Sequence, residues 1–66
     1  MPIIRVNHAS HLTETQIEAL MKELTDVYTS VTNSNPGAVH VLVEHVPADR
    51  WAVGGESLTA RRSKTS

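Results

Sequence analysis

The chain has 66 residues and a mass of 7.2 kDa, and a domain of this size buries only about 60% of the surface of its unfolded form. It contains no cysteine, so neither a disulfide nor a thiolate metal site stabilises it, and association between subunits is the main remaining device. The net charge is −1 and aromatic residues make up 3%, which argues against a nucleic-acid partner. Without an apolar run of about 18 residues or a basic leader, we expect a cytoplasmic protein with no membrane partner.

The first predicted element is a strand over residues 2–9, Pro-Ile-Ile-Arg-Val-Asn-His-Ala. β-branched residues dominate it, and it ends at small or polar residues, as strands often do. Side chains alternate between the two faces of a strand. One face therefore carries Ile4, Val6 and His8, and the other carries Ile3, Arg5 and Asn7.

A long helix is predicted to begin after Thr13. Thr13 and Gln16 have the spacing of a capping box, in which the hydroxyl and the amide each satisfy a backbone N–H of the first turn. The helix should end at residues 33–37, Asn-Ser-Asn-Pro-Gly, because these turn formers and the proline block its continuation. Between these limits, an apolar stripe recurs at helical spacing: Ile17, Leu20, Met21, Leu24, Val27, Tyr28 and Val31.

Residues 38–46 predict a second strand with two largely apolar faces. A strand, a long helix and another strand form a β-α-β unit, and its right-handed crossover makes the strands parallel. Residues 51–56, Trp-Ala-Val-Gly-Gly-Glu, predict a short C-terminal hairpin. The rest has little apolar content, so we expect a single α/β domain over residues 1–58 and a flexible tail over residues 59–66.

Two strands and one helix leave one face of the sheet without a cover. Burying that face stabilises the protein by about 25 cal/mol per Å², whereas a wet apolar face promotes aggregation. Pairing across a two-fold axis would widen the sheet and remove an exposed edge. We therefore expect a second subunit against this sheet.

Pro2 is the first candidate for chemistry. Removal of the initiator Met would leave it with a free secondary amine, and an ordinary α-amino group has a pKa of about 7.7–8.0. Partial burial disfavours the protonated form and moves the pKa toward neutrality, where a base can shift a proton between carbon and oxygen. Judged by its position alone, Pro2 is better explained as a proline that merely starts a strand, where its missing donor costs nothing.

Over about residues 2–58 the chain resembles the 4-oxalocrotonate tautomerase family. The resemblance rests on Pro-Ile-Ile at 2–4, Leu-Thr-Glu-Thr-Gln at 12–16, Val-Leu-Val-Glu at 41–44 and Trp-Ala-Val-Gly-Gly-Glu at 51–56. It implies a β-α-β chain that dimerises into a four-stranded sheet, with three dimers forming a hexamer. It also implies a cofactor-free isomerase that catalyses a 1,3-proton shift in a 2-oxo acid or its enol. Pro2 would be the general base and acid, and Trp51 would line the pocket.

The chain differs from typical members of this family at two substrate-binding positions. Where members typically have arginines, this chain has Leu12 before the helix and His40 in the second strand. A bidentate guanidinium–carboxylate contact is strong and selective, and neither leucine nor a neutral imidazole reproduces it. The substrate is thus expected to be a small carboxylic acid with an apolar distal group near Leu12. His40 would donate one hydrogen bond to the carbonyl oxygen.

Several alternatives stay open at this point. His8, His11, His40 and His45 match no helical metal-ligand spacing, and they are expected to point in different directions, so we predict no metal. Trp51 could anchor a subunit interface instead of lining a pocket, and His40 could be an ordinary strand histidine. The protein could also be a hydratase or dehalogenase of unsaturated acids, or a non-catalytic partner subunit. The hexamer could be homo- or hetero-oligomeric.

Overall fold

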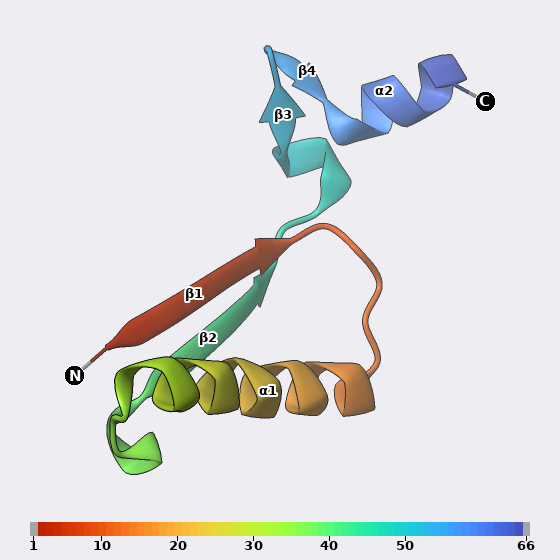
Figure 1. Cartoon of the computed structure of the whole chain (residues 1–66). Helices are drawn as coiled ribbons and strands as arrows, with labels where there is room; N and C mark the ends of the chain where they lie inside the picture. Colours follow the sequence, from red (N-terminus) through yellow and green to blue (C-terminus); the bar gives the residue numbers. More distant parts are fainter. Residues whose placement is uncertain (1, 66) are drawn as a thin grey trace.

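The structure, a computed structural model, describes the backbone of residues 2–65 and the side chains of residues 2–62. Met1, whose removal the sequence predicts, and Ser66, the last residue of the predicted tail, lie outside the described residues. The elements follow the order β1 Ile3–His8, α1 Glu14–Thr32, η1 Pro36–Ala38, β2 His40–His45, η2 Ala48–Arg50, β3 Ala52–Val53, β4 Glu56–Ser57 and α2 Leu58–Thr65 (Figure 1). The predicted β-α-β unit with a C-terminal hairpin is confirmed.

β1 and β2 form a parallel pair in which Ile3 lies opposite His40 and His8 lies opposite His45. The backbone bonding extends beyond the strands at both ends. The N–H of His40 donates to the Pro2 carbonyl at 3.0 Å, and the N–H of Val46 donates to the His8 carbonyl at 2.8 Å. The ladder therefore fixes the backbone from the start of β1 to the end of β2.

α1 begins with the predicted capping box. The Thr13 hydroxyl accepts from the Gln16 N–H at 3.1 Å, and the Gln16 side chain accepts from the Thr13 N–H at 2.9 Å. At the other end, Asn33 adopts the left-handed conformation with φ 59°, and its N–H donates to the Thr29 carbonyl at 2.8 Å. Asparagine tolerates this conformation better than most residues, so the sequence defines both ends of the helix.

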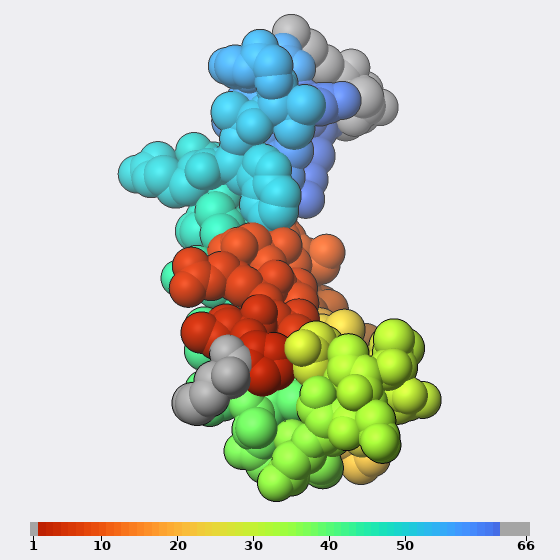
Figure 2. Space-filling view, turned by 60° about the vertical axis from the view of Figure 1, so that its left-hand side comes forward, coloured from red at the N-terminus to blue at the C-terminus, as the bar shows by residue number. Residues whose placement is uncertain are grey.

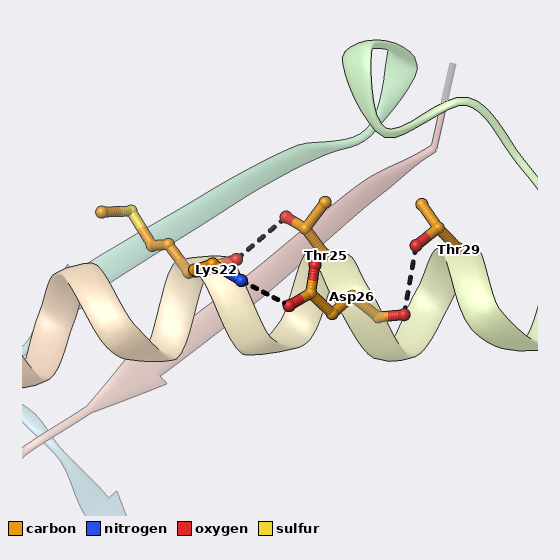
Figure 3. A network of polar contacts seen from close by, with 5 residues as sticks. Lys22, Thr25, Asp26 and Thr29 are labelled. Carbon is orange, nitrogen blue, oxygen red and sulfur yellow. Dashed lines mark hydrogen bonds and ion pairs between the residues drawn. The ribbon is translucent and has the colours of Figure 1, made fainter.

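A polar network runs along α1, with Lys22 and Asp26 exposed and Thr25 and Thr29 half-buried (Figure 3). Lys22 Nζ and Asp26 Oδ2 are 2.8 Å apart, and the hydroxyls of Thr25 and Thr29 donate to the carbonyls of Met21 and Asp26. The hydrogen bond to Asp26 raises the pKa of Lys22 above its usual 10.5. A raised folded-state pKa favours folding below pH 10.5, and this contribution is lost as the pH rises through the folded-state pKa. Because both side chains are exposed, the pair contributes little.

α1 covers one face of the sheet and packs mainly against β2. The predicted apolar stripe holds for most of its length but is wrong at Val27 and Val31, which are 61% and 80% exposed. A helix of 19 residues is roughly 28 Å long, whereas a strand of six spans roughly 20 Å. The last turns of α1 therefore extend past the sheet that the stripe would contact.

The second strand starts later than the sequence predicts. Residues 36–38 form the short 3-10 helix η1, and the Asn35 side chain accepts from the Gly37 N–H at 2.9 Å. Ala38 therefore belongs to a turn and not to β2, which begins at His40. The strong β propensity of the residues that follow obscured this boundary.

The residues after β2 form a C-terminal arm, defined here as residues 48–65. β3 and β4 pair antiparallel, and Gly54 and Gly55 connect them with φ of 63° and 84°. The Leu58 N–H then donates to the Trp51 carbonyl at 2.8 Å, and α2 follows where the sequence indicated no regular element. An isolated helix of eight residues is marginal in water, so a flexible tail over residues 59–66 stays a prediction, as does the domain boundary at residue 58.

The molecule is elongated, with extents of 45 × 25 × 15 Å. Its radius of gyration of 15.4 Å exceeds the value of about 11 Å expected for a compact chain of this length. Its accessible surface of 5042 Å² exceeds by roughly 900 Å² the area of about 4,100 Å² expected for a folded monomer of this mass. Figure 2 shows the arm standing away from the body, with β1 open to view between it and α1.

None of the described residues is fully buried in the isolated chain. In the sheet, the face away from α1 is uncovered; Ile3 is 61% exposed and Leu42 is 46% exposed there. This is the face against which the sequence predicts a second subunit. Among the described residues, no helix is long and apolar enough to cross a membrane.

Candidate active site

Pro2 lies half-buried at the amino end of β1. Its carbonyl is held by the N–H of His40, so the paired strands fix the position of the residue that would carry the amine. The His40 side chain is exposed and lies opposite Ile3 on the uncovered face of the sheet. The structure therefore brings Pro2 and His40 together at one end of the sheet.

Leu12 and Trp51 lie at the other end. Leu12 lies in the loop between β1 and α1, and Trp51 lies between η2 and β3, in segments that follow the carboxyl ends of the two strands. β1 has six residues between these ends, which corresponds to roughly 20 Å. A single chain therefore does not assemble the four predicted site residues into one pocket. Both Leu12 and Trp51 are half-buried.

A cavity of about 300 Å³ lies at the carboxyl ends of the strands. Leu12 forms part of its wall, so the cavity includes one of the predicted substrate-binding residues. Its lining combines side chains from β1, the following loop, α1 and β2: His8, Ser10, His11, Leu12, Ile17, Val43 and His45. None of these described lining residues is acidic.

Three of the four histidines converge on this cavity. The ring centroids of His8 and His45 are 5.3 Å apart in an edge-to-face arrangement, and those of His11 and His45 are 6.4 Å apart in a stacked one. The expectation that the histidines point in different directions is therefore wrong for these three. Parallel pairing places His8 opposite His45, and the loop after β1 brings His11 beside them.

The His8 ring has a defined orientation. Its Nδ1 lies 3.1 Å from the carbonyl oxygen of Ser10. A carbonyl oxygen only accepts hydrogen bonds, so Nδ1 must carry the proton. In the neutral ring, Nε2 is then an acceptor, and it becomes a donor when the ring takes up a second proton.

A second hollow of about 300 Å³ lies against the strands and is lined by Arg5, Leu42, Val43 and Glu44. Beside it, the Asn7 amide donates to Glu44 Oε1 at 2.9 Å. Arg5, Leu42, Asn7 and Glu44 belong to the uncovered face of the sheet. This face therefore offers an apolar patch with charged groups along it, as subunit interfaces often do.

No group of three or more His, Asp or Glu residues has the geometry of a metal site among the side chains that the structure describes. The prediction that the protein uses neither a metal nor another cofactor stays a prediction.

The chain is similar to known proteins over almost its whole length. The family model described as "Tautomerase enzyme" matches residues 2–61, almost the whole chain. The chain belongs to the 4-oxalocrotonate tautomerase family. A probable tautomerase of Dickeya dadantii is 30% identical over 67 residues, with all of both chains covered. A probable tautomerase of Staphylococcus epidermidis is 36% identical over 55 residues, covering 83% of this chain and 90% of the relative.

Solved structures of other tautomerase homologues superpose closely on the chain. TomN, a 4-oxalocrotonate tautomerase homologue in the tomaymycin biosynthetic pathway, matches with a TM-score of 0.92 and 35% identity over 98% of this chain and all of TomN. A heterohexameric 4-oxalocrotonate tautomerase from Chloroflexus aurantiacus has a TM-score of 0.81 and 22% identity, over 89% and 95% of the two chains. At that identity the likeness is one of fold.

One feature of this family member was not predicted from the sequence, namely the histidine cavity. Part of the signal was available, because alternation places His8 on the same face of β1 as Ile4 and Val6, which face the helix. Aligning the two strands in parallel from Ile3 and His40 then pairs His8 with His45. The position of His11 depends on the path of a loop, and no local pattern predicts that path.

Proposed function

We propose that the protein is a cofactor-free keto–enol tautomerase of small 2-oxo acids, with Pro2 as the general base and acid. The observation that supports this most is the family match over residues 2–61 together with a proline held at the start of β1 by its carbonyl. A proline that begins the mature chain has a secondary amine, and Met1 would have to be removed to free it. The catalytic role belongs to that nitrogen.

The reaction requires one proton to move and no electrons. The unprotonated Pro2 nitrogen removes a proton from a carbon atom adjacent to the substrate carbonyl, and the electron pair of the broken C–H bond forms the enolate. A hydrogen bond from His40 or a backbone N–H stabilises the negative oxygen. The protonated amine then returns the proton to oxygen or to another carbon, which completes the 1,3-shift. Burial of the amine keeps its pKa near the working pH.

A complete site needs a second copy of the chain. Pairing two strand edges across a two-fold axis makes them antiparallel, so the amino end of one sheet lies beside the carboxyl end of the other. Pro2 of one copy would then approach Leu12 and Trp51 of the other, which one chain holds at the opposite end of its sheet. The uncovered face and the excess accessible surface support such an assembly, and a hexamer of three dimers, with like or unlike chains, is the form we propose.

The substrate class follows from the residues at the two positions where family members typically have arginines. His40 provides one hydrogen-bond donor where a guanidinium would provide a bidentate contact, and Leu12 provides none. A substrate with a single carboxylate therefore fits better than a dicarboxylate. The cavity beside Leu12 has an apolar wall that would accommodate its carbon chain.

The test of this proposal removes the base in two ways. Pro2→Ala should lower kcat for a 2-hydroxydienoate or phenylenolpyruvate by at least about a hundredfold, the usual share of a general base. A short extension before Pro2 that survives processing turns the amine into an amide and should abolish activity, with Pro2 retained. The readout is ultraviolet absorbance of the enol, with intact mass reporting the chain start.

Pro36→Ala is the matched control, because this proline lies in η1 and its loss should leave kcat unchanged. Full activity in the extended chain would contradict the proposal. The two missing guanidiniums favour one alternative, a non-catalytic subunit of a mixed assembly. Inactivity of the unaltered homo-oligomer, with activity restored by a second tautomerase chain, would replace our proposal by that alternative.

A further inference from the structure

We propose that the cavity lined by His8, His11 and His45 is a carboxylate subsite, which binds the acid group of the substrate by taking up a proton. This inference rests on the proposed function for its substrate, but the subsite itself is defined by this chain's own residues. It assigns a role to three imidazoles that the proton transfer at Pro2 does not use.

The composition of the cavity suits a small carboxylic acid. Its polar wall is formed by imidazoles and the Ser10 hydroxyl, and its apolar wall is formed by Leu12, Ile17 and Val43. A small aliphatic acid has the same division between a charged end and a carbon chain. No carboxylate of the described residues lines the space, so no acidic group of the lining repels an anion.

The hydrogen bonding of His8 makes a protonated ring the better partner of a carboxylate. His8 Nδ1 donates to the Ser10 carbonyl, so neutral His8 offers its other nitrogen only as an acceptor. Protonation turns that nitrogen into a donor, and a charged donor bonds to a carboxylate more strongly than a neutral one. An imidazole ordinarily gains its proton below about pH 6.5.

The three rings are close enough for their charges to interact. His45 lies between two partners, with centroids 5.3 Å from His8 and 6.4 Å from His11. At these distances protonated rings repel one another, and a bound anion offsets that repulsion. Binding of an anion should therefore draw protons onto the cluster, and low pH should strengthen binding.

The other residues that line the cavity do not interfere with this coupling between anion binding and protonation of the rings. Ser10 from the loop, Leu12 before the helix, Ile17 from α1 and Val43 from β2 complete the lining, and none of them titrates in the neutral range. The three imidazoles are thus the titratable groups among the described lining residues. A pH dependence of binding in the neutral range would originate in them or in the ligand.

The test uses the full-length oligomer carrying Pro2→Ala, so that binding is measured without turnover. The probe is crotonate, a monocarboxylate that stays ionised in the neutral range, and crotonamide is its uncharged counterpart. Calorimetry should show that the affinity for crotonate is at least tenfold lower at about pH 8 than at about pH 6. At about pH 6.5, buffers of different ionisation enthalpy should reveal proton uptake on binding.

Variants then locate the site. His11→Gln and His45→Gln keep a polar side chain but lose the titrating ring, and each should weaken crotonate binding by at least about fivefold, the loss of one charged hydrogen bond. Lys22→Gln is the matched control, because it removes a positive charge from the exposed side of α1 and should leave binding unchanged. In NMR spectra, crotonate should shift the ring signals of His8, His11 and His45.

Specific outcomes would overturn the assignment. They are crotonate affinity that is independent of pH, crotonate affinity unaffected by both histidine variants, or binding of crotonamide as tight as that of crotonate. Inorganic phosphate is the comparison anion, and equal or tighter binding of phosphate would identify a general anion site and refute a carboxylate subsite. The Pro2 mechanism is tested separately. It would fail if chains with a blocked amine kept their turnover, whatever the result with crotonate.

Discussion

Pro2 and His40 are tied together by the first hydrogen bond of the strand pairing. As a peptide nitrogen the Pro2 nitrogen has no N–H to donate to a sheet, and the strand pairing holds the residue through its carbonyl. The ladder therefore fixes the residue without using its nitrogen. That arrangement suits a catalytic amine, which must be held in place and still be able to accept a proton.

Substrate preference should depend on the two positions where arginine is missing. The double variant Leu12→Arg with His40→Arg adds guanidiniums that can bind two carboxylates, and each charged contact is worth about 1.5–3 kcal/mol. We expect kcat/KM for a dicarboxylic enol to rise at least about tenfold relative to a monocarboxylic one. Steady-state kinetics on paired substrates measures this ratio.

The matched control is Leu12→Met with His40→Gln, which alters the same side chains without adding charge. An unchanged ratio in the arginine variant, with the control also unchanged, would mean that neither position contacts the substrate.

Individual residues were predictable from the sequence to different degrees. Pro2 stood out because of its position in the chain, and Thr13 because of its spacing from Gln16. The gathering of His8, His11 and His45 was not foreseen, because it depends on the register of two distant strands and on the path of a loop. Local patterns report local contacts, whereas a cavity wall joins segments that are far apart in the sequence.

At the level of elements, α1 is the best-defined part of the chain. Thr13→Ala removes the hydroxyl that accepts from the Gln16 N–H and should lower the free energy of unfolding by about 1 kcal/mol per chain. Urea denaturation at one fixed protein concentration measures the change. Thr13→Ser keeps the hydroxyl and should retain most of the stability, and equal losses in the two variants would contradict a capping role.

The elements were recognised where pattern and length agree. Alternation in β1, the helical period of α1 and the paired glycines of the hairpin each have one physical explanation. The prediction was less accurate at the ends of elements: Ala38 was assigned to a strand, and α2 was not foreseen. Both are short segments in which few residues contribute to any period. The exposed ends of the α1 stripe, at Val27 and Val31, reflect a helix longer than the sheet beneath it.

For the whole molecule, association should be a condition of folding and of activity. Leu42→Lys places a charge beside Arg5 on the uncovered face, and burying an unpaired charge at an interface is strongly unfavourable. We expect the variant assembly to dissociate at a protein concentration at least about a hundredfold higher than that at which the unaltered assembly dissociates. Activity should be lost in parallel. Native mass spectrometry and sedimentation velocity measure the subunit count.

Ser30→Lys is the control, since Ser30 is exposed on the outer side of α1 and the same charge there should leave the assembly intact. A Leu42→Lys protein that keeps both its subunit count and its activity would show that this face is not an interface. The need for a second copy could be predicted from chain length and from the number of elements. The elongated shape could not, because the direction in which the arm leaves the body is set by the turn at residues 46–51.

The arm packs chiefly on itself, through η2, β4 and α2, and it stands at the far end of the sheet from Pro2. In the proposed assembly, any contribution of the arm to a reaction at Pro2 is therefore made in a neighbouring subunit. Two inactive variants, one without the Pro2 amine and one without the Trp51 indole, should therefore complement each other when they are co-expressed. Each mixed pair would rebuild one intact centre from the sound half of each product, so defects at the two ends of this small protein would fall into separate complementation groups.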